Sequence, residues 1–450
     1  MSNQATTLPI SALSALQLNF LLLKLDGQIR VIEKHEMDAI LCGNKNSDIS
    51  FYKKNEGELL MKRFLEAQPI ASDVKNTIIE FWKNPATHVI DEIAFSPRKL
   101  PSTTLNYWIP PLINPQIGQW DLIRSYLKDV ICDGDAQIYD YLVKYLAHMV
   151  QHPEEKPGVM IILLGRQGTG KGMFFQLLAN IWSRSTLLLS DISQVVGQFN
   201  AALERSYVIC MDEAIFSGDR KSQDRLKSLV TEKTLRIEQK YQPSRSIESI
   251  HRIFAASNHH HFSQTESDDR RSLFIRVSAS RQNDHIYFSQ LSTAINDDAV
   301  IGAMLKHLID LDLSTFNIRS RPLTKEHNKQ KMLSLSGFDR YWYEVLCRGR
   351  FMVNHIYSSS SFDKSWQDDE FASSNSLLEG YKAFDKNAQR FQTVQIQEIT
   401  EALKRLCPSA TRHRASLNNT QVRGFMLPPL TVARSEFERA FSAKVDWEEL

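Results

Sequence analysis

Short apolar runs alternate with amphipathic segments through the middle of the chain. Three such runs, at 159–164, 206–211 and 250–256, each end in polar residues, which is typical of central strands in a parallel sheet. The segment 173–178, just after the first run, has the apolar spacing of an amphipathic helix. We therefore predict an α/β core over residues 156–280, built from a parallel sheet flanked by helices.

The regions before and after this core have different patterns. Strand-like and helical runs alternate through residues 1–85, which predicts a small accessory α+β domain. Residues 86–155 carry Tyr and Leu stripes at helical spacing, and these indicate packed helices rather than a ligand site. Residues 281–355 continue the core as a helical extension.

The C-terminal part begins with a polar stretch. Ser and Asp are frequent over residues 356–376, which predicts a flexible linker. Residues 377–450 then give two helices, a basic loop at 412–414 and a strand at 422–427. This order favours a winged-helix-like module that contacts duplex DNA, and a helical cap packed on the core is the alternative.

The most specific chemistry lies in residues 165–172. Gly165, Gly170 and Lys171 fit the phosphate-binding loop pattern, and the strand before it and the helix after it are the context this motif requires. Backbone N–H groups of such a loop surround phosphate oxygens, while the lysine reaches the β- and γ-phosphates. The predicted ATP-binding residues are Gly165, Gln167, Gly168, Thr169, Gly170, Lys171 and Gly172.

One position departs from this pattern. The residue after the lysine is normally Ser or Thr, whose hydroxyl binds Mg²⁺, but here it is Gly172. Either a water molecule takes that coordination position or Thr169 supplies the oxygen. The sequence leaves both alternatives open.

The other two core strands end in residues suited to ATP hydrolysis. Asp212 would hold Mg²⁺, and Glu213 would polarise the attacking water. Asn258 follows the third strand and is our candidate for orienting that water and sensing the γ-phosphate. Arg270 and Arg271 suit a finger that reaches the ATP of a neighbouring subunit, and a surface salt bridge with the preceding aspartates is the alternative.

A basic segment separates the second and third core strands. Residues 220–252 hold nine Lys or Arg against four Asp or Glu, in a pattern that predicts a basic helix and then a β-hairpin. Lys240 and Tyr241 fall near the hairpin tip, and Arg236 and Arg245 lie beside it. Such a hairpin can hold phosphates and stack on a base, whereas a solvated surface hairpin is the alternative.

The composition bears on the partners and the cellular compartment of the protein. The net charge of +2 does not indicate any class of partner, and only local clusters of charge can do so. Five cysteines without paired spacing argue against a zinc site or a disulfide framework and suit a reducing cytoplasm. No apolar run approaches the ~20 residues that span a bilayer, and no signal peptide is evident. We therefore expect a cytoplasmic protein without a membrane partner.

Taken together, these motifs resemble the superfamily 3 helicases, and most closely the helicase part of phage and plasmid primase-helicases, related to the poxvirus primase-helicase. That family's order is motif A, motif B, a basic B′ hairpin, motif C and an arginine finger. The matching residues here are 165–171, Asp212 with Glu213, Lys240, Asn258, and Arg270 or Arg271. The likeness covers residues 85–278 well and 380–450 more loosely, and members with Lys-Gly at the end of motif A occur in the phage and plasmid branch.

The resemblance implies a P-loop, AAA+-like ATPase that uses ATP and Mg²⁺ and forms a hexameric ring around single-stranded DNA. Its B′ hairpins would track the strand, translocation would run 3′–5′, and the helices before the core would form an oligomerisation collar. The setting would be replication of a phage, plasmid or other mobile element in the cytoplasm of a bacterial host. Residues before 85 show no acidic catalytic cluster, so priming would fall to a separate primase or primase-polymerase.

Two other functions stay open. One is an AAA+ origin initiator or loader that does not unwind processively, and the other is an ATP-gated oligomeric scaffold or defence component. Glu213, Asn258 and the two arginines argue against the scaffold, because a scaffold has no need of hydrolytic residues. RNA instead of DNA as the track also stays open.

Overall fold

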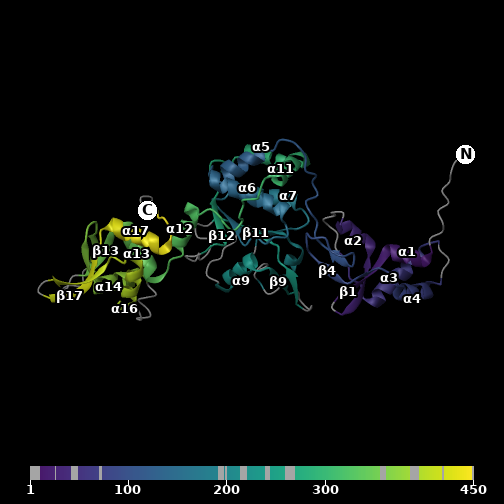
Figure 1. The fold of residues 1–450 in the computed structure, drawn as a ribbon, viewed down its shortest axis with the longest axis horizontal. Coiled ribbons are helices and arrows are strands. Elements are labelled where there is room, and N and C mark those ends of the chain that lie inside the picture. Colours follow the sequence, from purple (N-terminus) through teal and green to yellow (C-terminus); the bar gives the residue numbers. More distant parts are fainter. Residues whose placement is uncertain are drawn as a thin grey trace. The chain divides into compact units, whose positions relative to one another are not determined.

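The structure is a computed structural model that describes residues 11–25, 27–41, 49–69, 73–190, 197, 200–212, 220–238, 244–258, 269–354, 361–385, 395–417 and 420–447. The chain divides into two compact units (Figure 1). The first comprises residues 1–214, 219–258 and 275–322, and the second comprises 215–218, 259–274 and 323–450. In the part of the chain that is described, no helix has both the length and the apolar character needed to cross a bilayer.

The first unit begins with a small sheet covered by helices. Strands β1 (Phe20–Leu25) and β2 (Gln28–Glu33) pair antiparallel, and β3 (Val89–Ile90) runs parallel to β1. The helices are α1 (Ala12–Asn19), α2 (Lys34–Leu41), α3 (Lys54–Glu66) and α4 (Val74–Lys83). Helix α3 lies so close to β2 that a Cβ at Gly57 would come 2.4 Å from Val31 Cγ2. The alternation of strands and helices that the sequence predicts in this region is confirmed.

Short strands and three helical segments lead to the core. Strands β4 (Glu92–Ala94) and β5 (Thr104–Asn106) pair in parallel. Helix α5 (Asp121–Ser125) runs into a π-helix, Tyr126–Ile131, and α6 (Ala136–Gln151) follows. The helices predicted for this region are therefore confirmed, but the π-helix has no counterpart in the prediction. Single π-helical turns are rare and are frequently found at functional sites.

Strands β6, β11, β8 and β7 form the centre of the first unit, and they belong to a five-stranded sheet with the order β12-β6-β11-β8-β7. The pairs β6/β11, β11/β8 and β8/β7 are all parallel. The bounds are β6 (Met160–Leu164), β7 (Thr186–Leu189), β8 (Val208–Met211), β11 (Arg252–Ser257) and β12 (Ser272–Arg276). Every residue of β6, β8 and β11 is buried, which explains the continuous apolar sequence of β6 and β8 and the apolar centre of β11 between Arg252 and Ser257. The predicted parallel sheet is confirmed.

Helices flank this sheet. Figure 1 shows α6, α7 (Lys171–Ile181) and α11 (Asp298–Asp310) gathered on one side, with α9 (Arg220–Thr231) on the other. A 3₁₀ helix (Ala201–Arg205) precedes β8, and α10 (His285–Ile295) packs against α7. Strands β9 (Thr234–Ile237) and β10 (Arg245–Glu248) pair antiparallel after α9, so the predicted basic helix and hairpin stem are confirmed.

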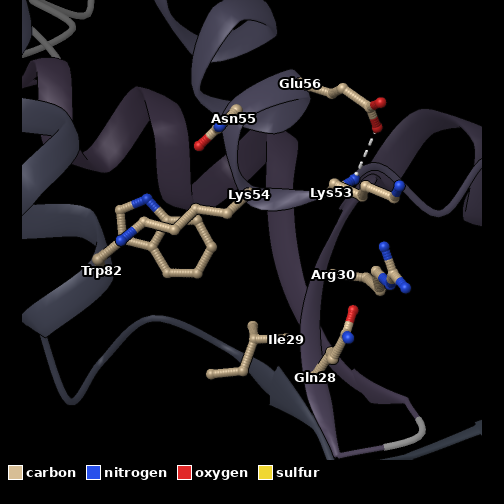
Figure 2. Close-up of a pocket in the computed structure, with 8 residues that line it drawn as sticks. All are labelled: Gln28, Ile29, Arg30, Lys53, Lys54, Asn55, Glu56 and Trp82. Carbon is tan, nitrogen blue, oxygen red and sulfur yellow. Dashed lines mark hydrogen bonds between the residues drawn. The ribbon is translucent and has the colours of Figure 1, made fainter.

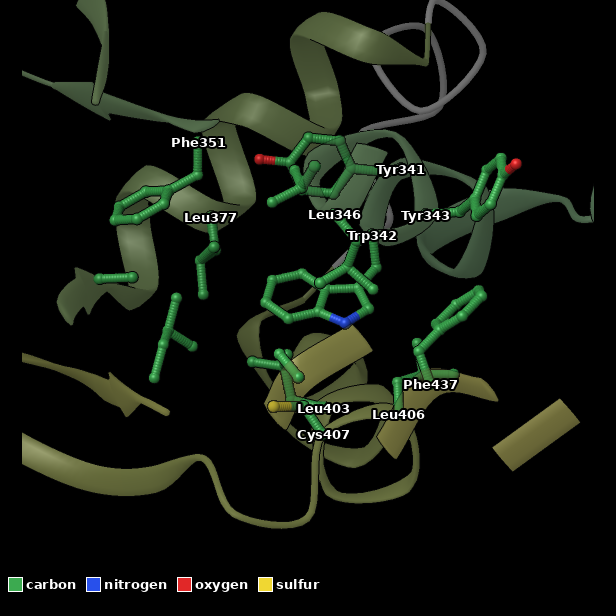
Figure 3. Close-up of a cluster of buried hydrophobic side chains, with 14 of the residues drawn as sticks. Tyr341, Trp342, Tyr343, Leu346, Phe351, Leu377, Leu403, Leu406, Cys407 and Phe437 are labelled. Carbon is green, nitrogen blue, oxygen red and sulfur yellow. The ribbon is translucent and has the colours of Figure 1, made fainter. Parts of the chain in front are cut away.

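The second unit has its own apolar core. Its helices are α12 (Lys325–Leu333), α13 (Gly337–Arg348), α14 (Ser374–Phe384), α16 (Ile396–Leu406) and α17 (Leu430–Phe441). Its strands are β13 (Arg350–Asn354), β14 (Ser361–Ser365), β15 (Glu370–Ser373), β16 (Thr411–Leu417) and β17 (Thr420–Leu427). Figure 3 shows Trp342 of α13 between apolar side chains of α16 and α17, and Trp342 is fully buried. Strands β15, β17 and β16 form one sheet, and β13 pairs with β14.

Two sequence predictions are wrong in this unit. Residues 361–365 and 370–373 form β14 and β15, where we expect part of a flexible linker. Trp366 explains why this segment is structured, because its buried indole donates a hydrogen bond to the Pro428 carbonyl oxygen at 3.0 Å. The basic residues 412–414 lie on β16 and not on a loop, since each pairs with a residue of β17.

A chain of hydrogen bonds lies beside the start of β11. Lys156 Nζ donates to Ser249 Oγ at 2.5 Å, and Ser249 Oγ lies 2.9 Å from His251 Nδ1. His251 Nε2 lies 2.9 Å from the Leu203 carbonyl oxygen, which can only accept, so this nitrogen carries the proton. Nδ1 then accepts from the Ser249 hydroxyl. The buried ring is fully satisfied in its neutral form.

We predict that these contacts make stability depend on pH. Burial and the nearby Lys156 ammonium lower the pKa of His251 to about 3, and burial and Arg252 lower that of His148 to about 3. Both rings are neutral in the folded state, whereas in the unfolded chain they protonate near pH ~6.5. The free energy of unfolding should therefore fall as pH drops from ~6.5 toward 3, by about 1.4 kcal/mol per pH unit for each histidine.

Urea unfolding of wild type and of His251→Gln at intervals between about pH 5 and 7 checks this. Gln can donate to the Leu203 carbonyl oxygen and accept from Ser249, but it does not titrate. The variant should lose about 1.4 kcal/mol per pH unit of slope in the lower part of this window. Equal slopes for the two proteins would contradict the assignment.

Candidate functional site

Residues 165–170 form a loop between the end of β6 and the start of α7. Gly168 has φ +77° and Gly170 has φ +97°, a left-handed region that side chains rarely adopt. The Gly165 N–H donates to the Ser257 carbonyl oxygen of β11 at 3.2 Å, which ties the loop to the next strand. Helix α7 begins directly after Gly170, so its N-terminal N–H groups face the loop. Sequence reasoning placed this loop correctly between strand and helix.

The Lys171 ammonium is buried at the centre of the loop. Its Nζ donates to the carbonyl oxygens of Gly165 and Arg166, both at 2.8 Å. A third bond, also 2.8 Å, goes to Asn258 Oδ1 at the end of β11. Because β6 and β11 are parallel, their carboxyl ends meet at this edge, which brings these residues of distant sequence together. The lysine and the amide that the sequence predicts for one site are in direct contact.

Thr169 and Gly172, the two residues considered for Mg²⁺, differ in their surroundings. Thr169 is buried, and its hydroxyl donates to the Arg166 carbonyl oxygen at 2.9 Å. Gly172 is exposed on the first turn of α7, with no atom within 4 Å of the place its Cβ would take. The proton of the Thr169 hydroxyl is thus used within the loop itself, and the lone pairs of its oxygen are not.

Three residues that the sequence predictions missed hold the loop from outside. The buried Tyr126 hydroxyl, from the π-helix, donates to the Gly170 carbonyl oxygen at 2.9 Å, and burial raises the pKa of this phenol well above its usual value. The Asn283 N–H donates to the Gly168 carbonyl oxygen at 3.0 Å. The Phe288 ring lies so close to Gly170 that a Cβ there would come 2.6 Å from Phe288 Cε1. Tyr126 stood out only as part of a packing stripe, so no local sequence signal points to these contacts.

The structure describes some of the residues predicted to act in ATP hydrolysis. Asp212 is exposed at the end of β8, and its N–H donates to the Leu189 carbonyl oxygen at 2.8 Å. Glu213 lies outside the described residues. Arg270 and Arg271 belong to the second unit, where Arg270 is exposed and the Arg271 N–H donates to Asp269 Oδ1 at 3.1 Å.

The hairpin stem is fixed by a residue that the sequence analysis did not single out. The Asn200 side chain accepts from the Glu238 N–H at 2.8 Å and donates to the Arg236 carbonyl oxygen at 3.0 Å. The exposed Arg236 guanidinium donates to Ser244 Oγ at 2.7 and 3.0 Å. Arg245 lies on β10 opposite Ile237. Lys240 and Tyr241 lie outside the described residues, so the predicted tip stays a prediction.

The fold defines a class before any relative is considered: a mixed α/β protein with a parallel sheet flanked by helices. Residues 163–271 match a family of unknown function, DUF5906. This segment runs from the end of β6 past Asp212 and Asn258 to Arg271, and therefore contains the lysine–amide contact.

One relative and two similar structures carry the name of the same phage, NrS-1. The DNA primase-polymerase of Nitratiruptor phage NrS-1 is 28% identical over 155 residues, which are 34% of this chain and 21% of the phage protein. An apo structure of the NrS-1 C-terminal region has a TM-score of 0.60 at 15% identity and covers 92% of this chain and 97% of that region. A second has a TM-score of 0.61 at 16% identity, covering 92% and 98%.

These matches support homology to the C-terminal region of the phage protein. The structural likeness shows a shared fold. The sequence match spans about a fifth of the primase-polymerase.

Proposed function

We propose that this chain is an ATP-hydrolysing helicase with a superfamily 3, AAA+-like P-loop core that acts in replication of a phage, plasmid or related element. The observation that carries the proposal is the 2.8 Å contact between Lys171 Nζ and Asn258 Oδ1. It joins the predicted motif A lysine to the predicted motif C amide at one edge of a parallel sheet. Similarity to a phage primase-polymerase supports the replication setting.

The proposed chemistry assigns each group a role. The loop 165–172 binds the phosphates of ATP through backbone N–H groups, and Lys171 exchanges carbonyl oxygens for β- and γ-phosphate oxygens. Glu213 polarises the attacking water, and Asn258, released from the lysine, orients it. Asp212 follows β8, which is the neighbour of β11 in the sheet, so it lies at the same sheet edge. There it would hold Mg²⁺, and the ion would neutralise phosphate charge. A water molecule or the Thr169 hydroxyl would complete the ion's coordination, because that hydroxyl donates its proton to the Arg166 carbonyl oxygen and keeps its lone pairs.

The DNA contacts and the assembly rest more fully on the resemblance. Lys240 and Tyr241 at the hairpin tip, with Arg236 and Arg245 on the stem, would hold single-stranded DNA in the channel of a hexamer. Arg270 or Arg271 would complete the ATP site of the neighbouring subunit. The 3′–5′ direction and the bacterial host cytoplasm also come from the resemblance.

The C-terminal elements support a winged-helix-like module. Helix α16 is followed by the antiparallel strands β16 and β17, and β17 also pairs with β15, so a β-hairpin follows a helix as a wing does. Arg414 of β16 lies directly opposite Arg423 of β17. Like charges in this position repel each other across a sheet, and DNA phosphates between them would relieve the repulsion.

The test is ATP turnover and strand displacement on a forked duplex with one labelled strand. We expect single-stranded DNA to stimulate turnover, and ATP, but not a non-hydrolysable analogue, to release the label. Turnover without displacement would overturn the helicase and favour a loader or an ATP-gated scaffold. Absence of turnover in a folded protein would overturn the ATPase.

A further inference from the structure

A basic pocket of about 600 Å³ lies in the N-terminal part of the first unit. Its walls come from β2, the first turn of α3 and the end of α4. Figure 2 shows Arg30 and Lys53 on one side of the opening and Lys54 with Trp82 on the other. No residue of the candidate nucleotide site lines this pocket.

The charges that line the pocket are mostly positive. Arg30, Lys53 and Lys54 are cationic, and Glu56 is the one anionic residue of the lining. The Glu56 carboxylate already accepts the Lys53 N–H at 2.9 Å, so it serves as part of the helix cap. Neither the Arg30 guanidinium nor the Lys53 ammonium makes an ion pair or hydrogen bond to another described residue. Two cationic groups therefore face the pocket without a described counterion.

The indole of Trp82 forms a flat wall beside these cations. Phe81, fully buried, contacts it edge-on at a centroid distance of 6.5 Å at the end of α4. The Lys54 ammonium lies 5.2 Å from the ring centroid, and the Lys54 stem crosses the indole in Figure 2. The Lys54 ammonium is also 3.9 Å from the Glu58 carboxylate, and its side chain is 64% exposed.

We propose that this pocket binds a segment of single-stranded nucleic acid, with Arg30 and Lys53 at phosphates and a base stacked on Trp82. Cations that follow a backbone and an aromatic face that takes a base are the two components of such sites. A base must first displace Lys54 from the indole. An exposed cation–π contact and an exposed ion pair are each weaker than base stacking on an aromatic ring, so the exchange favours the base.

Other anions use only part of this pocket. An inorganic phosphate needs the cations but not the indole, and its volume is far below the space available. An acidic peptide offers carboxylates but no planar ring to match the indole. The proposal does not depend on ATP hydrolysis, so it can hold or fail separately from the proposed helicase.

The test is photocrosslinking of the full chain to a single-stranded oligonucleotide of about ten nucleotides that carries 5-iodouracil. We expect a crosslink in the peptide that contains Trp82, found by mass spectrometry. Arg30→Ala/Lys53→Ala should abolish most of it, and the salt dependence of this crosslink should weaken by about 1.4 log units per log unit of salt, for two lost phosphate contacts.

The matched control is Lys62→Ala/Arg63→Ala, which removes the same charge from the exposed far end of α3. It should leave the crosslink at Trp82 unchanged. Lys171→Met should also retain it, since the pocket needs no ATP. A crosslink found only elsewhere in the chain, equal yields from the two double variants, or full competition by free phosphate would overturn the proposal.

Discussion

Lys171→Met should reduce ATP turnover by about 10³-fold, the order expected when one charged group that stabilises the transition state is removed. Met keeps much of the length and volume of the lysine stem but lacks the ammonium. The three oxygen atoms that now accept from Nζ, on Gly165, Arg166 and Asn258, would lose that donor. Steady-state phosphate release with saturating ATP and Mg²⁺ measures the effect.

Two further variants show whether the loss is chemical or structural. Lys144→Met removes a half-buried lysine of α6 that pairs with the exposed Asp140 at 2.8 Å, and it should keep full turnover because ion pairs at the surface contribute little. Asn258→Ala breaks the contact with Lys171 from the other side but keeps the ammonium. It should still bind ATP while hydrolysing it slowly. If Lys171→Met were folded and fully active, the loop would not be the nucleotide site.

The sheet, and the candidate site residues at the ends of its strands, could be predicted from sequence. Each of these strands is a short segment that is fully buried. Apolar runs identify β6, β8 and β11, and burial on both faces is typical of strands that pair in parallel. Parallel pairing then brings their carboxyl ends to one edge, which is why Lys171 and Asn258 meet as expected.

The contacts around the loop could not be predicted, because they join residues far apart in sequence. Tyr126, whose hydroxyl donates to the Gly170 carbonyl oxygen, lies 44 residues before Gly170 in the sequence. It belongs to a π-helix, which the spacing of apolar residues does not predict. Strand β14 was missed for a related reason. It lies in polar sequence, and it is ordered by pairing with β13 and by the burial of Trp366 just beyond it, neither of which is visible along the chain.

Gly170→Ala should lower ATP turnover by about 100-fold. Gly170 has φ +97°, where a residue with a side chain is strained by about 1–3 kcal/mol. The new Cβ would also come 2.6 Å from Phe288 Cε1 and 2.9 Å from Cζ, closer than carbon atoms approach without movement. The loop can relieve both only by changing conformation, and a displacement of about 1 Å at a catalytic group is enough for such a loss. Turnover and ATP affinity, measured on the same preparation, check the prediction.

Gly172→Ala is the matched control, two residues further along the same loop and helix. A Cβ there meets no atom within 4 Å, and Gly172 has no positive φ. Alanine also favours a helix by up to about 1 kcal/mol over glycine, so this variant should keep its activity and unfold at an equal or slightly higher temperature. Both substitutions add one methyl group. A difference in activity between the two variants would therefore come from the backbone conformation and surroundings of Gly170, and not from the methyl group itself. Equal activity of the two variants would mean that the left-handed turn at Gly170 is not required for nucleotide binding.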